Sequence, residues 1–397
     1  MLNLTRLLGG RIPEGDDLRY DPRISRTDRG ALPGRGPVVV WNWTRVCNLA
    51  CVHCYASAVQ GRVSGELDTA EAEGLLAEFA EMRVPALLLS GGEPLARPDA
   101  IALLSAARRL GLRCTLSTNG TLIDDTRAQA LREAGATYVG ISLDGPPEVH
   151  DIWRGAQGAH AASLRAIRRL RALGVPVGLR FTLHRKSVAH VPYVLDLAER
   201  EGIGRICFYH LVPSGRGQGL EELQLSRPEA RACVETLLER SSAQLCAGVD
   251  IEILTVGNHS DSAFAYLWLR QHAPERAAAA LELLRRNGGN RAGMAMVCID
   301  PTGGVHPDQF SWDVDLGNVR RTPLRKIWEG GAAAPLLEGL RNRRSRITGR
   351  CGGCGWFPLC NGNLRARASA AGDFWGSDPG CLLEDAELDA EGVLAPS

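Results

Sequence analysis

Three closely spaced cysteines constrain this chain more than any other feature of its sequence. Cys47, Cys51 and Cys54 follow a C-x3-C-x2-C spacing within the segment WNWTRVCNLACVHCY, residues 41–55. Three thiolates on one short loop can ligate three irons of a [4Fe–4S] cluster and leave the fourth iron open to another ligand. Zinc sites more often combine a C-x2-C pair with a distant second pair, and three neighbouring cysteines cannot all form disulfides. The spacing therefore favours an iron–sulfur cluster, beside which His53 is expected to pack.

Composition narrows the class of protein. The chain has 397 residues, of which 45% are hydrophobic and 23% charged, with a formal net charge of +1. This is typical of a globular protein of about two or three domains, and it argues against nucleic acid or an anionic membrane as the main partner. The 12 cysteines are too sparse for a small secreted disulfide scaffold. With no stretch apolar enough to span a bilayer and no convincing signal peptide, the chain is expected in a reducing cytoplasm.

Strand and helix patterns alternate along the first half of the chain. Short apolar runs predict six strands, at 38–43, 86–89, 113–117, 137–143, 177–183 and 205–210. Helical spacing of apolar residues predicts helices between them, at 69–82, 99–110, 124–134, 160–173 and 188–200. Six βα units are fewer than a closed eightfold barrel needs, so the pattern predicts a partial (β/α)6 barrel of the TIM type. Its active site is expected at the carboxyl ends of the strands.

The pattern also divides the chain into segments. Residues 1–36, rich in Arg, Asp, Gly and Pro, are expected to form an irregular lead-in, and 37–225 the partial barrel. Residues 226–289 are expected to be a helical connection, with amphipathic helices at 226–245 and 273–286. From residue 290 onward glycine turns and four cysteines replace the βα rhythm, which predicts a separate C-terminal domain, 290–397, held together by metal.

A second motif stands at the end of the predicted strand after the cysteines. Residues 87–94 read LLLSGGEP, and glycines at a strand end let backbone approach a ligand without a Cβ in the way. The cysteine spacing and this GGEP segment together resemble the radical S-adenosylmethionine (radical SAM) superfamily. The resemblance implies that S-adenosylmethionine occupies the open iron and is cleaved there.

The resemblance also implies the residues that hold S-adenosylmethionine. The GGEP residues would contact its amino group, and the polar strand ends STNG (117–120) and SLDG (142–145) would lie near its ribose and carboxylate, with Arg180 as a carboxylate partner. Alternatively, the two Gly-containing strand ends only form turns, and Arg180 only forms an ion pair within the protein. The candidate cofactor-binding residues are Gly91, Gly92, Glu93, Pro94, Ser117, Asn119, Ser142, Asp144 and Arg180.

The C-terminal cysteines suggest a second metal centre. Cys351, Cys354, Cys360 and Cys381 could close either a [4Fe–4S] cluster or a zinc site by count alone. Their spacing resembles the SPASM class of C-terminal domains in radical SAM enzymes, in which more cysteines hold two auxiliary clusters. Here Asn290, Asp308 and Leu364 stand at positions where such domains have cysteines. One auxiliary cluster is therefore expected, ligated by all four cysteines, which makes two [4Fe–4S] clusters in all. For Asn290 and Asp308, contact with iron is one alternative, and exposed polar turn residues are the favoured interpretation.

Several longer stretches resemble one branch of the superfamily, the radical SAM proteins of haem d1 biosynthesis, over nearly the whole chain. They are WNWTRVCNLACVHCY, FYHLVPSGRG (208–217), IDPTGGVHPDQF (299–310) and LGNV (316–319). The resemblance implies an iron tetrapyrrole substrate, didecarboxysirohaem, which loses propionate side chains through a 5′-deoxyadenosyl radical. It also implies a low-potential electron donor of the flavodoxin or ferredoxin type.

Such a substrate needs cationic groups for its carboxylates and an axial ligand for its iron. Arg216 and His210 are the candidate substrate-binding residues, with His306 and His184 as alternatives for the iron. Three other functions stay open. They are decarboxylation of iron-coproporphyrin in the alternative haem pathway, modification of a peptide by a SPASM-type enzyme, and metal binding without catalysis. The first 36 residues look too short for the leader-peptide module that a peptide-modifying enzyme usually needs.

Overall fold

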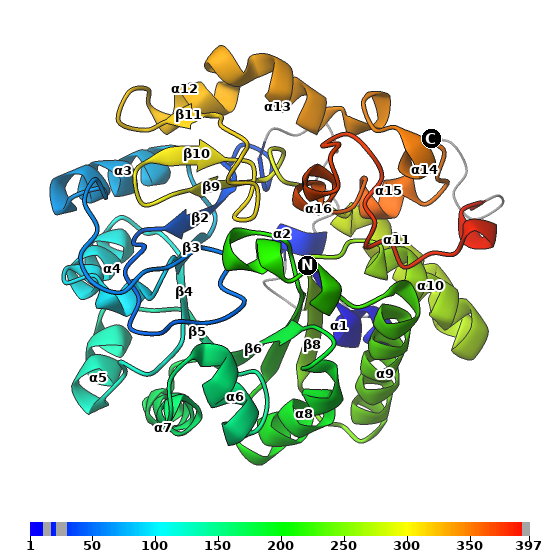
Figure 1. Cartoon of the computed structure of the whole chain (residues 1–397), viewed down its shortest axis with the longest axis horizontal. Coiled ribbons are helices and arrows are strands. Elements are labelled where there is room, and N and C mark those ends of the chain that lie inside the picture. Colours follow the sequence, from blue (N-terminus) through cyan, green and yellow to red (C-terminus); the bar gives the residue numbers. More distant parts are fainter. Residues whose placement is uncertain (11–16, 21–29, 391–397) are drawn as a thin grey trace.

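A computed structural model of the chain describes residues 1–10, 17–20 and 30–390. Its centre is one sheet with helices around the outside (Figure 1). The six predicted strands are confirmed, and each pairs in parallel with the next. They are β2 (Val38–Asn42), β3 (Leu87–Ser90), β4 (Cys114–Thr118), β5 (Tyr138–Ser142), β6 (Val177–Leu183) and β7 (Arg205–His210).

The sheet continues beyond these six strands on both sides. β8 (Glu252–Val256) pairs in parallel with β7, and β9 (Met296–Ile299) pairs in parallel with β2. Short antiparallel strands form the edges, β1 (Leu2–Asn3) on β8, and β10 (Gly304–His306) followed by β11 (Gly317–Asn318) on β9. The order is β1-β8-β7-β6-β5-β4-β3-β2-β9-β10-β11. The edge strands do not pair with each other, so the barrel is open, as predicted.

Helices cover the outer face of the barrel (Figure 1). The side chains of Asp68 and Asp124 accept backbone N–H groups at the starts of two of them, α3 and α5. The predicted helices are confirmed as α3 (Thr69–Glu81), α4 (Ala100–Arg109), α5 (Asp125–Glu133), α7 (Ala159–Ala172), α8 (Val191–Arg200), α9 (Arg227–Cys246) and α11 (Pro274–Asn287). Two further helices, α6 (Pro147–Arg154) and α10 (Asp261–His272), were not predicted.

Two segments differ from the prediction. Residues 226–289 contain β8 as well as helices, because all five residues of the apolar run Glu252–Val256 are buried beside β7. The described part of the lead-in is not irregular either. It contains α1 (Leu4–Gly9), which buries Leu4, Leu7 and Leu8, and the short α2 (Asp17–Tyr20). The rest of the predicted lead-in, residues 11–16 and 21–29, lies outside the described residues.

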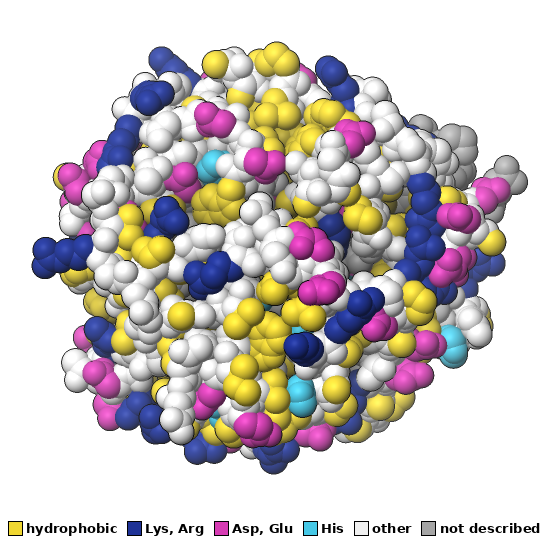
Figure 2. All heavy atoms as spheres, in the orientation of Figure 1, with side chains coloured by type: hydrophobic (Ala, Val, Ile, Leu, Met, Phe, Trp, Pro, Cys, Tyr) yellow, Lys and Arg dark blue, Asp and Glu magenta, His cyan; other side chains and the backbone are white. Residues whose placement is uncertain are grey.

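The C-terminal segment packs against the barrel and shares its sheet through β9. The predicted domain boundary at residue 290 therefore stays a prediction, and residues 391–397 lie outside the described part. The helices here are short: α12 (Leu324–Glu329), α13 (Ala334–Arg341), α14 (Gly349–Gly352), α15 (Phe357–Cys360) and α16 (Arg365–Ala370). No helix among the described residues is long and apolar enough to cross a bilayer. Acidic and basic side chains are interspersed over the face drawn in Figure 2.

Candidate functional site

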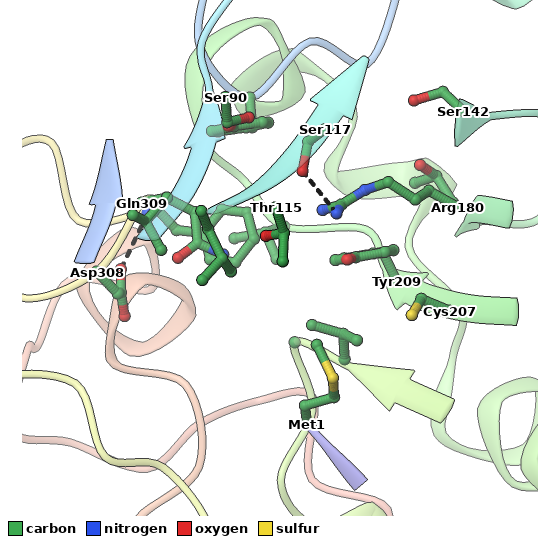
Figure 3. A pocket seen from close by; sticks show the side chains of 18 of the residues that line it. Met1, Ser90, Thr115, Ser117, Ser142, Arg180, Cys207, Tyr209, Asp308 and Gln309 are labelled. Atoms are coloured by element: carbon green, nitrogen blue, oxygen red, sulfur yellow. Dashed lines mark hydrogen bonds between the residues drawn. The ribbon is translucent and has the colours of Figure 1, made fainter. Parts of the chain in front are cut away.

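A cavity of about 900 Å³ lies inside the partial barrel and reaches the carboxyl ends of its strands (Figure 3). It brings most of the predicted site residues together, whereas Glu93, Pro94 and Asp144 do not line it. Arg180 and Ser117 lie across the cavity from Asp308 and Gln309 (Figure 3). The predicted residues that line it are Cys47, Cys51, Cys54, Gly91, Gly92, Ser117, Asn119, Ser142, Arg180, His210 and Arg216.

The cysteine loop forms a small apolar cluster of its own. Cys47 and Cys51 are buried and Cys54 is half-buried, and the three pack with Leu49 and Ala58. Backbone N–H groups point at the sulfurs, since Leu49 N lies 3.3 Å from Cys47 Sγ and Ala58 N lies 3.4 Å from Cys54 Sγ. Burial raises the pKa of the Cys47 thiol to about 12. A thiol in this place therefore keeps its proton unless a metal displaces it, which suits a cluster ligand.

Gly91 and Gly92 are required by the cysteine loop itself. A Cβ on Gly91, whose φ is +130°, would lie 2.3 Å from the carbonyl oxygen of Thr44, and a Cβ on Gly92 would lie 2.4 Å from that of Val46. The backbone N–H of Gly92 donates to Thr44 O (2.7 Å), and that of Glu93 donates to Val46 O (2.8 Å). The end of β3 thus holds the chain that enters the cysteine loop, and side chains at these positions would push it away.

Glu93, predicted to contact the amino group of the cofactor, has partners within the protein. Its carboxylate is buried, and it accepts hydrogen bonds from Thr118 Oγ1 (2.7 Å), Asn119 N (2.8 Å) and Leu95 N (3.1 Å). Burial raises the pKa of this carboxyl group. Glu93 therefore ties the end of β3 to the end of β4 from below the cavity.

The strand ends supply the polar wall of the cavity. The guanidinium of Arg180 on β6 donates to Ser117 Oγ at the end of β4 (2.7 Å) and stacks over the ring of Tyr209 at 4.6 Å (Figure 3). A Cβ on Gly140 would lie 2.9 Å from Arg180 Cδ, so this glycine makes room for the side chain. No acidic partner of Arg180 is found among the described residues, which leaves its charge available to a ligand carboxylate.

Asp144, predicted to lie near the ribose, also has partners within the protein. It is buried, with its carboxylate 2.7 Å from Arg154 Nη2 and 3.6 Å from His53 Nε2. Arg154, at the end of α6, also places Nη1 3.7 Å from Cys51 Sγ. A chain of contacts thus runs from a cysteine sulfur through a buried arginine to a buried acid. Arg154 could not be predicted from spacing, because its partners are distant along the chain.

Arg216 braces the cysteine loop. Its backbone N–H donates to Cys54 O (2.9 Å), and its guanidinium donates to Cys51 O (2.8 Å) and Ala58 O (2.6 Å). Arg216 also lines the cavity, and its Nη2 has no hydrogen-bond partner in the described part of the chain, so the predicted substrate contact stays a prediction. The short 3-10 helix η3 (Gly215–Gly219) is therefore part of the support for the cysteine loop.

The histidines named from the sequence differ in whether they line the cavity. His210 lines the cavity, with Nε2 3.0 Å from Asp261 Oδ2. The ring of His306 bonds to Val314 O (2.8 Å) and Asp300 Oδ2 (3.3 Å), while His184 is buried against Trp153 with ring centroids 4.1 Å apart. Neither lines the cavity.

The C-terminal cysteines meet at a second, small cavity beside the barrel. Cys351, Cys354, Cys360 and Cys381 line it together with residues that include Ala263 and Leu388. Asn290, Asp308 and Leu364 lie instead on the main cavity. Asn290 and Asp308 are only 2% and 4% exposed, so the expectation that they are exposed turn residues is wrong. Their side chains accept from nearby backbone N–H groups, of Ala292 and Phe310 respectively, which explains why they can be buried.

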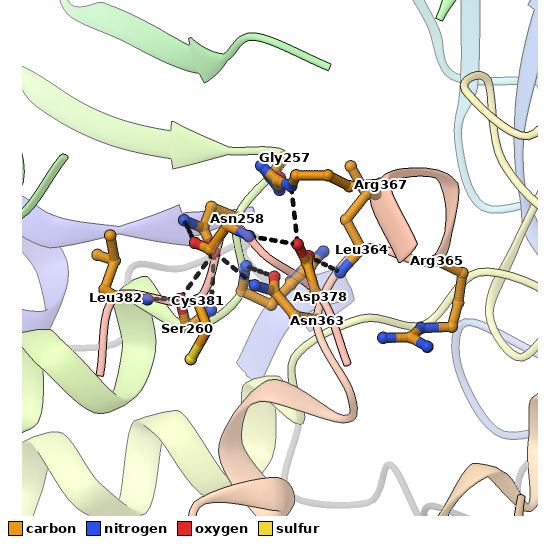
Figure 4. A network of polar contacts seen from close by, with 12 residues as sticks. Gly257, Asn258, Ser260, Asn363, Leu364, Arg365, Arg367, Asp378, Cys381 and Leu382 are labelled. Atoms are coloured by element: carbon orange, nitrogen blue, oxygen red, sulfur yellow. Dashed lines mark hydrogen bonds and ion pairs between the residues drawn. The ribbon is translucent and has the colours of Figure 1, made fainter. Parts of the chain in front are cut away.

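A polar network joins this second site to the loop after β8 (Figure 4). The N–H of Leu382, next to Cys381, donates to Ser260 Oγ (3.0 Å). Asn258 Oδ1 accepts from Asn363 Nδ2 (2.7 Å), near Cys360 in the sequence. The cysteine segments and residues 257–261 therefore hold each other in place.

The chain is similar to known proteins over nearly its whole length. The family model described as the radical SAM superfamily matches residues 41–198. A protein of Methanosarcina barkeri named Fe-coproporphyrin III synthase is 42% identical over 395 residues, which cover 98% of this chain and 99% of that protein. The chain belongs to the radical SAM superfamily. This confirms the predicted superfamily and makes the protein a radical SAM enzyme, which implies a [4Fe–4S] cluster and S-adenosylmethionine.

Two further similarities place this radical SAM enzyme more closely. The pre-heme d1 synthase of Dinoroseobacter shibae is 38% identical, over 94% of this chain and 91% of its own. The crystal structure of Streptococcus suis SuiB bound to precursor peptide SuiA has a TM-score of 0.69 at 17% identity, covering 88% of this chain and 76% of that one. This structural likeness concerns the fold alone and confirms the SPASM-type architecture.

Proposed function

We propose that the enzyme removes carboxylate-bearing side chains from an iron tetrapyrrole of a haem pathway through a 5′-deoxyadenosyl radical. The observation that carries this proposal is the single cavity of about 900 Å³, which joins the cysteine loop to an apolar wall. That volume is near the upper end for small-molecule sites and suits a macrocycle. The near full-length similarity to two enzymes named for tetrapyrrole products supports it.

An apolar wall of the cavity, whose Phe310 packs on Tyr55 of the cysteine loop, suits the face of a macrocycle. Val212, Leu364 and Phe310 pack together there with Ala366. Leu364 is one of the positions where a larger SPASM domain has a cysteine, so an apolar side chain replaces a cluster ligand on this wall. Burial of apolar ring surface against it would supply most of the affinity.

The identity of the tetrapyrrole is proposed from a resemblance in sequence. We take didecarboxysirohaem as the first candidate, since the HPDQF segment with Asp308 resembles the haem d1 proteins. The relatives are named for two different products, Fe-coproporphyrin III and pre-heme d1. Decarboxylation of iron-coproporphyrin in the alternative haem pathway is therefore supported about as well.

The residues around the cysteine loop suit the cofactors of this chemistry. Cys47, Cys51 and Cys54 would ligate the cluster, and the backbone at Gly91 and Gly92 would face the methionine part of S-adenosylmethionine. Ser117, Asn119, Ser142 and Arg180 would hold its ribose and carboxylate. When bound, these groups supply a radical able to take hydrogen from an unactivated carbon. The protein's own part is to place that carbon and to keep water out.

A second [4Fe–4S] cluster at Cys351, Cys354, Cys360 and Cys381 belongs to this proposal. All four thiols line one small cavity, and four cysteines can ligate the four irons of one cluster. The second cluster would accept or relay the electron released by the substrate, with a flavodoxin- or ferredoxin-type protein as donor to the first.

Anaerobic turnover tests the function. The reconstituted enzyme is incubated with S-adenosylmethionine, a reductant and either didecarboxysirohaem or Fe-coproporphyrin III, and both 5′-deoxyadenosine and tetrapyrrole masses are followed. We expect 5′-deoxyadenosine to form together with a tetrapyrrole that has lost side chains. If 5′-deoxyadenosine forms while both tetrapyrroles keep their mass, the proposal fails. Turnover of Fe-coproporphyrin III alone, or a product matching Fe-coproporphyrin III, would decide for the alternative.

A further inference from the structure

His210 and Asp261 form a buried pair at the edge of the main cavity. His210 ends β7 and is 6% exposed, while Asp261 begins α10 and is fully buried. His210 Nε2 lies 3.0 Å from Asp261 Oδ2. A carboxylate only accepts hydrogen bonds, so Nε2 carries a proton, and in the neutral imidazole Nδ1 then has the lone pair. Nδ1 makes no hydrogen bond to any described residue, and the side chain lines the cavity.

This arrangement matches the way proteins hold a histidine that binds a metal. Such a histidine donates its second ring N–H to a carboxylate or carbonyl, which fixes the ring and makes the ligating nitrogen more basic. The other oxygen of Asp261 is buried without a hydrogen-bond partner in the described part of the chain. His210 is therefore the side-chain hydrogen-bond partner of this buried acid, whose charge also interacts with the N-terminal amine of Met1.

Other histidines near the cavity lack these properties. His53 lines the cavity, but its Nε2 faces the carboxylate of Asp144, which Arg154 already pairs. His259 also lines the cavity, yet no carboxylate holds its ring in the described structure. His210 alone among these three combines an open ring nitrogen with an acid that belongs to it.

The pair is also held rigidly and lies beside the apolar wall. Residues 258–260, just before Asp261, are fixed to the C-terminal segment by the network of Figure 4, including Ser260 Oγ to Leu382 N at 3.0 Å. His210 lies two residues before Val212 of the wall formed with Leu364 and Phe310. A nitrogen ligand beside a flat apolar surface is the combination that an iron macrocycle requires.

We infer that His210 Nδ1 is an axial ligand of the substrate iron and that Asp261 is the residue that positions it. This inference rests on the proposed function and deepens it. The bond is a donation of the nitrogen lone pair to iron, so no proton or electron changes place. Its effect is to fix the centre of the macrocycle relative to the cysteine loop, and hence which side chains reach the radical.

Pulsed electron paramagnetic resonance (EPR) tests the ligand directly. The holoenzyme, grown with isotope-labelled histidine and kept with its clusters oxidised, is mixed with ferric Fe-coproporphyrin III. We expect hyperfine coupling between the iron and a histidine nitrogen in the wild type, and its loss in His210→Ala. Free imidazole should restore an axial nitrogen in that variant. Coupling that persists in His210→Ala would overturn the assignment.

His259→Ala is the matched comparison, since His259 lines the same cavity without an acid of its own. It should keep the coupling, and loss of coupling in His259→Ala instead of His210→Ala would also overturn the assignment. Binding is measured separately by ultrafiltration with Fe-coproporphyrin III and didecarboxysirohaem. If neither binds, the proposed function itself fails. If they bind but show no histidine coupling, only the axial ligand fails.

Asp261→Asn tests the positioning role. Loss of the carboxylate should weaken retention of ferric Fe-coproporphyrin III about 10–100-fold, as loss of outer-shell partners does at metal sites. It should also raise the reduction potential of the bound iron, because the imidazole becomes a poorer donor. A purely structural role would leave that potential unchanged, so an unchanged potential in Asp261→Asn would contradict the inference.

Discussion

At the scale of single residues, Arg154 links two buried groups beside the cysteine loop. Its guanidinium lies 2.7 Å from the carboxylate of Asp144 and 3.7 Å from the sulfur of Cys51. Although burial alone would raise it, the neighbouring charge of Arg154 lowers the pKa of Asp144 to about 2. Asp144 is therefore a charged group without access to water, and its burial is tolerated chiefly because Arg154 compensates its charge.

Replacing Arg154 should be costly for stability. Arg154→Met leaves the Asp144 charge buried without its partner, which typically costs about 3–5 kcal/mol. Urea unfolding of the cluster-free protein measures the change. The double variant Asp144→Asn/Arg154→Met should recover part of the loss, because it removes the stranded charge. Equal stability of the wild type and the single variant would contradict this account.

Gly91 should be needed for cluster assembly. In Gly91→Ala, the new methyl group would meet the Thr44 carbonyl at 2.3 Å with φ at +130°, so the chain entering the cysteine loop must shift. We expect the first cluster to be lost, measured as iron per chain and by EPR of the reduced protein.

Gly74→Ala is the matched control for that variant. Gly74 lies on the exposed side of α3 with no atom within 4 Å of a built Cβ. Alanine should keep the cluster and stabilise the helix by about 0.5–1 kcal/mol. Normal iron content in Gly91→Ala would show that the loop tolerates the clash.

At the scale of elements, the hairpin of β9 and β10 depends on the charge of His306. Its two ring nitrogens meet two acceptors, Val314 O and Asp300 Oδ2, and a charged imidazole donates to both. Although burial alone would lower it, these partners raise the pKa of His306.

This pairing predicts a pH-dependent contribution to stability. A raised pKa in the folded state means that the stabilisation is complete below the unfolded pKa of about 6.5 and is lost as pH rises through the folded value. The gap in unfolding free energy between the wild type and His306→Gln should therefore narrow from acidic to alkaline pH. A gap that stays constant over this range would show that the charge of His306 contributes nothing.

The elements that sequence reasoning predicted and missed differ in how local their signals are. The six strands β2 to β7 and their helices were predictable, because each carries its own apolar run or helical spacing. β8 and α1 were missed, because their short apolar runs become structure only when they pack on β7 and on α9.

The same contrast holds within the site. The cysteines and the glycine strand end were visible from spacing alone. The partners of Glu93, Asp144 and Arg216 were not, because Thr118, Arg154 and the carbonyl groups of the cysteine loop reach them only in three dimensions. Sequence reasoning therefore identified side chains of the right chemistry. For several of them it predicted a contact with a ligand, whereas the structure shows a contact with another part of the protein.

At the scale of the whole molecule, two groups of cysteines should be separable. Cys54→Ala should abolish cleavage of S-adenosylmethionine, since it removes a ligand of the open cluster. Cys381→Ala should remove one cluster's worth of iron yet keep part of that cleavage, because its site is a separate cavity. Iron content and 5′-deoxyadenosine formation measure the two effects. Equal loss of cleavage in both variants would contradict the division of labour.

The pairing of β2 with β9 has a consequence for synthesis. β2 leads directly into the cysteine loop, and Val38 pairs with Met296, which leaves the ribosome much later. Until then, one side of β2 presents unpaired N–H and C=O groups on an apolar strand, a surface that can join another chain. We expect this edge to need protection until β9 has been made, and iron loading of the loop to follow translation, once β9 has paired with β2.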